Sequence, residues 1–175
     1  KECVEVTFRW LNSFDDKGAT VFDNLMSEPT EHAQSCQSTI DDQALKKRNI
    51  LLIEDFGTTG LTGSTDISNN EEFSAFWRKN GLSHKNGGKL GRNGLGKIVY
   101  STSSLIGAFF GITKRDEDDQ YYLMGQSVLD VRDFNKITYN PYGFFCDKGP
   151  ADGVKPYIDT PGSDKYKKTR HFALE

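Results

Sequence analysis

The sequence lacks an excess of basic residues and any long apolar run. Lysine and arginine total 22 against 25 aspartates and glutamates, which gives a formal net charge of −3. A strongly basic surface marks nucleic-acid binding, so the composition does not signal that function for this domain, although a local basic patch stays compatible with it. Because no apolar stretch reaches the length of a membrane span and no secretory signal is present, we expect no membrane association and a cytoplasmic location.

Cysteine is also scarce. The three cysteines, Cys3, Cys36 and Cys146, are odd in number and form no CxxC or Cys/His metal pattern. We therefore expect free thiols, as in proteins of a reducing compartment, and predict no metal ligand among these residues.

What the chain does contain is typical of a globular protein. Of its 175 residues, 27% are charged and 12% are aromatic, and no internal repeat is visible. This length can bury a sizeable core, so we predict a single domain over residues 1–175. The sequence begins at Lys1 and enters an alternating strand pattern almost at once, which we interpret as part of a larger protein.

The periodicity predicts an α/β protein. Alternation predicts a half-buried strand over 2–11, and the apolar run Ile50–Ile53 predicts a short strand covered on both faces. Further along, we expect a helix over about 70–79, capped by Asn69 or Asn70 and packed through Phe73, Phe76 and Trp77, then a loop over 82–93 and a helix over 94–104. We also expect two hairpin strands over 105–113 and 120–131, joined by the charged turn KRDEDD, whose acidic run we interpret as solvated. This order favours a two-layer α/β sandwich with a mixed, largely antiparallel sheet. We expect at most one short helix in the polar excursion 12–47, and assign no role to the tail 141–175.

Two glycine-bearing segments carry the functional signal. In ILLIEDFGTTGLTG, Ile50 to Gly63, an apolar strand ends in Asp55 and breaks into a loop with Gly57 and Gly60. In GGKLGRNGLGKIVYSTSS, Gly87 to Ser104, a glycine-rich loop opens a helix. Backbone N–H groups of such a loop and the positive end of the helix dipole favour phosphate, so the pair suggests a nucleotide site.

Each segment alone also fits another motif. GRNGLGK, Gly91 to Lys97, has the spacing of a P-loop, but Ile98 stands where the magnesium-holding hydroxyl belongs and HKNGGKL before it is no buried strand. Asp55-Phe56-Gly57 spells the magnesium motif of protein kinases, but the upstream catalytic loop of a kinase is missing. A structural reading remains for Asp55 as well, as a turn residue bonded to backbone amides.

Taken together and in this order, the two segments resemble the GHKL ATPase superfamily, whose members include DNA gyrase, the MutL and MORC ATPases, the large heat-shock chaperones and histidine kinases. The family's adenine motif is D-x-G-x-G and its phosphate motif is G-x-x-G-x-G at a helix start. Asp55 and Gly57 match the first motif, with Gly60 one residue late, and Gly91, Gly94 and Gly96 match the second. The resemblance covers about residues 2–131 and implies the Bergerat fold, nearer to the MutL, MORC and chaperone side.

The resemblance implies ATP and Mg²⁺ as ligands. Asp55 would accept the exocyclic amine of adenine, which guanine does not present, while Gly57 would let the backbone approach the base and Thr58 and Thr59 would hold a water or the base edge. An ATP lid is expected over 61–90, with Ser83 and Lys85 as its S-x-K element. Phosphate contacts would come from Gly91, Asn93, Gly94, Leu95, Gly96 and Lys97.

In the family, the residue that activates water and an asparagine that holds magnesium lie on a helix before the first strand, so no catalytic residue is assigned here. The leading prediction is the ATP-binding domain of a GHKL-type ATPase, in which ATP closes the lid and drives homodimerisation of a larger protein. DNA or protein clients would act through other domains. The alternatives are a non-catalytic binding or scaffold module of the same fold and a P-loop NTPase, in which Lys97 rather than Asp55 would dominate binding.

Overall fold

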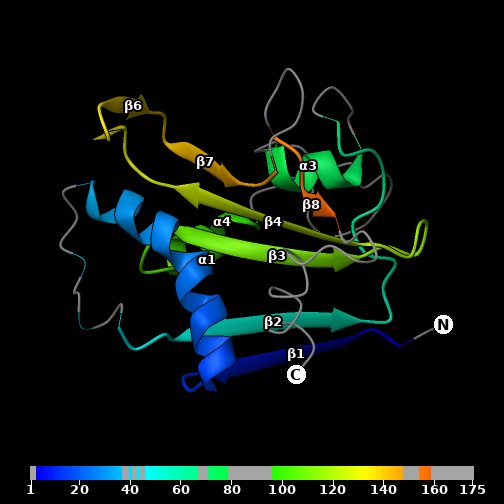
Figure 1. Cartoon of the computed structure of the whole chain (residues 1–175). Coiled ribbons are helices and arrows are strands. Elements are labelled where there is room, and N and C mark those ends of the chain that lie inside the picture. Colours follow the sequence, from blue (N-terminus) through cyan, green and yellow to red (C-terminus); the bar gives the residue numbers. More distant parts are fainter. Residues whose placement is uncertain are drawn as a thin grey trace. The chain divides into compact units, whose positions relative to one another are not determined.

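The computed structural model describes residues 3–36, 40, 43, 46–66, 71–78, 96–147 and 154–158 (Figure 1). Over these residues the protein is a mixed α/β structure, and every strand pair is antiparallel. The chain divides into two compact units, of which the first includes Lys1–Thr58 and the second is Thr59–Gly162. The α/β class and the antiparallel hairpin predicted from the sequence are confirmed.

The first unit contains a two-stranded sheet of β1 (Glu5–Leu11) and β2 (Ile50–Phe56). Its register pairs Phe8 with Ile53 and Trp10 with Leu51, so these four apolar side chains share one face. On the other face, Glu54 accepts a hydrogen bond of 3.0 Å from Nε of Arg9. Both strands were predicted.

The predicted burial of these strands is wrong. Phe8 is 67% exposed and Trp10 62%, and on β2 Leu51 is 51% exposed, whereas Arg9 and Glu54 on the opposite face are partly covered. Alternation fixes which side chains share a face, but burial depends on whether another element covers that face. No element in the described ranges buries the apolar face of this sheet.

Helix α1 (Asp16–Gln34) occupies the polar excursion, where only a short helix was expected. The Asp15 side chain caps its start by accepting a 2.7 Å bond from the Gly18 amide. Its buried residues recur at three- and four-residue spacing and so form one stripe: Gly18, Val21, Phe22, Pro29, His32 and Ala33. The stripe is diluted by small and polar residues, which is why hydrophobic periodicity alone did not reveal the full length.

The second unit is built on the sheet β3–β4–β7, with β8 also paired to β4. The hairpin of β3 (Ala108–Lys114) and β4 (Tyr121–Val128) carries β7 (Tyr142–Phe145) and β8 (Tyr157–Ile158), while β5 (Arg132–Phe134) and β6 (Ile137–Tyr139) form a separate small hairpin. Strands β7 and β8 lie in the tail that had no predicted elements. Their short lengths of four and two residues are below what periodicity can reveal.

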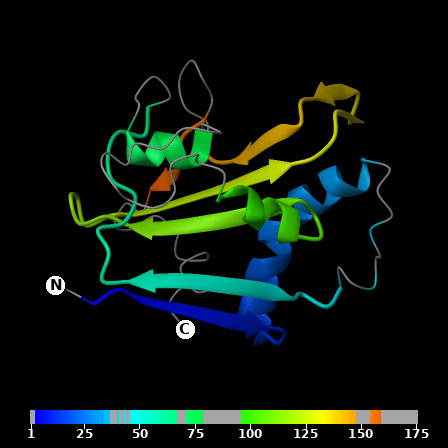
Figure 2. The same ribbon diagram turned by 180° about the vertical axis from the view of Figure 1, so that it is seen from behind.

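One face of this sheet holds the core. Helix α3 (Glu72–Arg78) packs its buried side chains onto β4, where Phe73, Trp77, Tyr122 and Met124 form one cluster. The Trp77 ring stacks on Phe109 with centroids 5.5 Å apart. Helix α4 (Ile98–Ser103) lies against β3 and β4 (Figure 2). The prediction that the aromatic helix before the second motif is a packed element is confirmed.

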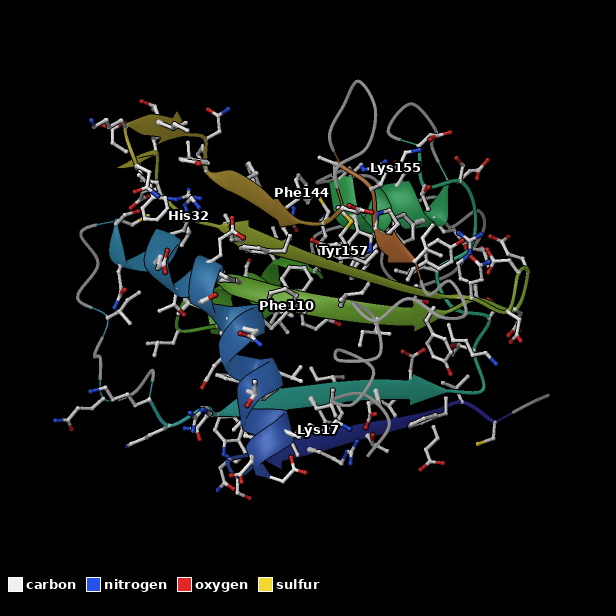
Figure 3. All side chains as sticks on the ribbon, in the orientation of Figure 1. Lys17, His32, Phe110, Phe144, Lys155 and Tyr157 are labelled. Carbon is white, nitrogen blue, oxygen red and sulfur yellow. The ribbon has the colours of Figure 1, made fainter. Side chains whose placement is uncertain are left out.

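The opposite face of the sheet carries Phe110, labelled on β3 in Figure 3. Its ring lies 5.4 Å from that of Phe145, and it covers Gly125 on the neighbouring strand, where a Cβ would come within 2.6 Å of the ring. A glycine in a strand interior usually weakens a sheet, but here it leaves space for an aromatic ring.

Several predicted boundaries shift in the structure. Helix α4 begins at Ile98 rather than near Gly94, with Gly96 and Lys97 in a turn before it. Strand β3 begins at Ala108 rather than Leu105 because Gly107, at φ +61°, completes a turn after the helix. The predicted caps Asn69 and Asn70 and the loop 82–93 lie outside the described residues.

The two tryptophans provide a test of the unequal cover over the two sheets. Trp10 is 62% exposed and Trp77 is 2% exposed, so acrylamide should quench tryptophan emission in two components. We expect Trp10→Phe to remove the accessible component and leave a poorly quenched emission from Trp77. Uniform quenching of wild type, or an unchanged accessible component in the variant, would contradict the exposed face of β1 and β2.

Candidate functional site

Asp55 lies at the end of β2, as predicted, and its side chain is exposed. One carboxylate oxygen, Oδ2, accepts a 2.7 Å hydrogen bond from the Thr58 hydroxyl. This bond closes a short loop over Phe56 and Gly57 and fixes the orientation of the carboxylate. In the part of the chain that the structure describes, Oδ1 accepts no hydrogen bond and is available to a ligand donor.

The backbone at both glycines of the first motif leaves no room for a side chain. Gly57 and Gly60 each have φ +73°, a left-handed conformation that residues with a Cβ rarely adopt. A Cβ at Gly57 would lie 2.6 Å from the Cys3 carbonyl oxygen, and one at Gly60 would collide with the Lys114 carbonyl oxygen. The glycines therefore shape the chain through its own backbone, whether or not a base also approaches Gly57.

From Thr59 onward, the loop is bound to the β3–β4 hairpin. The Thr59 carbonyl accepts a 3.3 Å bond from the Asp116 amide, and the Leu61 amide donates a 2.8 Å bond to the Thr113 hydroxyl. The Thr62 carbonyl then accepts from the Phe73 amide at the start of α3. Residues 59–62 thus have a defined conformation, and Thr59 contributes through its backbone.

Of the second motif, the structure describes Gly96 and Lys97. Lys97 is buried, and its ammonium donates a 2.6 Å hydrogen bond to the Phe76 carbonyl in the last turn of α3. Gln126 donates a 3.2 Å bond to the neighbouring Trp77 carbonyl, so two buried side chains cap the carboxyl end of this helix. Burial lowers the pKa of Lys97 from its ordinary value.

A cavity of about 150 Å³ adjoins Lys97. It lies between α4, the end of β4 and the start of β7, and its walls include the apolar side chains of Ile98 and Val128. Its polar lining residues are Lys97, Ser101, Thr102, Gln126 and Tyr142. The volume is below the roughly 300–1,000 Å³ of typical small-molecule pockets, so the cavity would hold only part of a nucleotide.

The predicted site residues fall in both units. Asp55, Gly57 and Thr58 belong to the first, and Thr59, Gly60, Gly96 and Lys97 to the second. The remaining predicted residues lie outside the described ranges: Ser83, Lys85, Gly91, Asn93, Gly94 and Leu95.

Sequence reasoning did not select Gln126 and Tyr142. Gln126 interrupts the apolar face of β4 at a period-two position, and that polar exception on a core face was the available signal. Tyr142 lies on a strand that was not predicted.

The structure also bears on disulfides, metal ligands and membrane-spanning helices. The three cysteines are free, as predicted. The described residues contain no group of three or more His, Cys, Asp or Glu side chains that could hold a metal ion. No helix in the described ranges combines the length and apolar character that a membrane crossing requires.

Replacing Gly60 tests the loop geometry. Gly60→Ala places a Cβ against the Lys114 carbonyl in a left-handed conformation, and we expect the free energy of unfolding to fall by at least about 1–2 kcal/mol. Gly96→Ala is the matched control, because a Cβ at Gly96 meets no atom within 4 Å. Equal destabilisation of the two variants in urea unfolding would contradict this account.

Lys97 has a defined pH signature. Because its folded-state pKa is lowered below the ordinary 10.5, the folded protein releases this proton first, and its stability relative to Lys97→Met should rise as pH climbs toward 10.5. Lys114 is the opposite control, since the hydrogen bond from its ammonium to Asp119 raises its pKa. The advantage of wild type over Lys114→Met should instead shrink as pH rises. A flat or falling difference for Lys97 in chemical unfolding would contradict its burial as a charged group.

Comparison of the chain with protein-family models, curated proteins and solved structures found no match.

Proposed function

We propose that this protein binds ATP as the nucleotide-binding domain of a GHKL-type ATPase. In this proposal, Asp55 selects adenine, the glycine-rich loop ending at Lys97 holds the phosphates with Mg²⁺, and the fold is a two-layer α/β sandwich of the Bergerat type. The observation that carries the proposal is the end of β2, where an exposed carboxylate fixed by Thr58 is followed by two glycines at φ +73°.

The chemistry at Asp55 suits an adenine amine. The bond from Thr58 to Oδ2 holds the carboxylate in one orientation, so Asp55 loses less rotational freedom when a ligand binds. Oδ1 can then accept a hydrogen bond from an incoming N–H donor. A charge-assisted hydrogen bond of this kind contributes about 1.5–3 kcal/mol when it is shielded from water. Guanine places a carbonyl oxygen at the same position, and two acceptors repel each other, so ATP should be preferred over GTP.

The order and type of the elements also support the proposal. An antiparallel strand pair precedes the Asp55 loop, and the aromatic helix, α4 and the β3–β4 hairpin follow in the order that the resemblance requires. The cavity beside Lys97 is lined by hydroxyl, amide and ammonium groups, and those of Ser101, Gln126 and Lys97 already donate hydrogen bonds to backbone carbonyls. Because Lys97 already caps α3, its contribution to phosphate binding would come with a cost to that cap.

Hydrolysis and ATP-driven homodimerisation of a larger protein are further parts of the proposal. The resemblance places the water-activating residue and the magnesium-holding asparagine on a helix before the first strand, and the proposal names no catalytic residue. The exposed apolar face of β1 and β2 favours a second candidate, a binding or scaffold module of the same fold without turnover.

Calorimetry with magnesium nucleotides tests the proposal. We expect wild type to bind ATP more tightly than GTP, and Asp55→Asn to weaken ATP binding by about 10–100-fold, because the amide cannot supply a carboxylate acceptor. Asp116→Asn, another exposed aspartate, is the matched control and should bind as wild type does. Equal affinity for ATP and GTP would contradict adenine selection. Loss of binding in Lys97→Met together with unchanged binding in Asp55→Asn would favour the P-loop alternative.

A further inference from the structure

Arg115 is a buried cation at the tip of the β3–β4 hairpin. It is 7% exposed, and its guanidinium lies 4.3 Å from the centre of the Tyr122 ring. Its Nη2 forms ion pairs with Glu117 and, at 2.9 Å, with Asp118. The acidic run of this turn is exposed, as predicted for a solvated hairpin turn, and two of its carboxylates also neutralise the buried Arg115.

The cluster of Arg115, Glu117 and Asp118 also binds the loop that follows the adenine motif. Nη1 of Arg115 donates a 2.8 Å hydrogen bond to the Gly63 carbonyl, and the Gly63 amide donates a 3.1 Å bond to Glu117. The ion pair of Arg115 and Glu117 therefore binds both the carbonyl and the amide of Gly63. Together with the bonds at Thr59 and Leu61, this fixes residues 59–63 on the hairpin.

The cluster is itself rigidly supported. The Tyr122 hydroxyl donates a 2.7 Å bond to Asp118, and burial together with this bond raises the pKa of Tyr122 to about 12. The Tyr122 ring belongs to the core cluster of Phe73 and Trp77. Arg115 thus connects the loop to the most buried part of the second unit rather than to a free surface turn.

We propose that Arg115 is a positioning residue for nucleotide binding, which holds residues 59–63 in a preformed conformation and so maintains the loop that Asp55 begins. This inference rests on the proposed function. We call the hold of Arg115 and Glu117 on Gly63 the clamp. A loop that is already ordered loses less conformational freedom when a ligand binds, so the clamp contributes affinity without touching the ligand. The guanidinium fork is required, because a lysine ammonium cannot hold Gly63 and both carboxylates with the same planar geometry.

Arg115→Lys separates positioning from charge. We expect amide hydrogen exchange at Leu61 and Gly63 to rise and the Kd for magnesium ATP to increase about tenfold. The control is Lys114→Met, which removes an exposed ion pair with Asp119 on the same hairpin and should change neither quantity. Glu117→Gln, at a partly exposed position, tests the clamp from the other side and should shift both quantities in the same direction if Arg115→Lys fails to fold.

The outcomes distinguish the two proposals. Unchanged exchange at Gly63 in both clamp variants would overturn the clamp whether or not ATP binds. Raised exchange with unchanged ATP affinity would overturn the positioning role. Absence of ATP binding by wild type would overturn the proposed function and, with it, the role of Arg115 in nucleotide binding.

Discussion

The chain leaves β2 through two glycines in a left-handed conformation, and this turn brings the Thr58 hydroxyl to the candidate adenine-binding carboxylate of Asp55. Gly57 passes the Cys3 carbonyl, and Gly60 passes the Lys114 carbonyl, each too closely for any side chain. The Thr58 hydroxyl, between them, binds Asp55. A Cβ at Gly57 would displace the chain beside the bond between Asp55 and Thr58, and a Cβ at Gly60 would displace the loop where it is attached to the β3–β4 hairpin.

A second constraint is the burial of charged side chains beside the aromatic core. Lys97 and Arg115 both extend their cationic groups to backbone carbonyls, Phe76 for the one and Gly63 for the other. Burying a charge without partners is costly, so these bonds are tightly linked to the folded state. Lys97, in the segment that resembles a phosphate loop, and Arg115, in the charged hairpin turn, therefore both stabilise the fold through these bonds.

Much of the secondary structure could be predicted because it follows from local pattern. Alternation located β1, the apolar run located β2, and the charged turn located the β3–β4 hairpin. Burial could not be predicted in this way, because the apolar residues Phe8 and Trp10 are exposed although they alternate correctly. Helix α1 was underestimated because its buried stripe includes Gly18 and Pro29, which periodicity does not count as apolar helical positions.

The candidate site was predictable in part for the same reason. Asp55 and its glycines form a contiguous motif, so the sequence placed them at a strand end and the structure agrees. Gln126 and Arg115 depend on contacts across 49 and 52 positions in the sequence, and such distant partners leave no local pattern. The bond between Lys97 and Phe76 likewise joins residues 21 positions apart in two segments that periodicity treats separately.

The most direct test of the central claim is to map where the base of a bound nucleotide lies. Photolabelling with 8-azido-ATP in the presence of magnesium, followed by peptide mass spectrometry, reports the residues nearest adenine. The account predicts labelling within the peptide containing residues 50–63, suppressed by excess ATP and weakly by GTP. Labelling confined to peptides elsewhere in the chain, or labelling that ATP does not suppress, would contradict adenine recognition at Asp55.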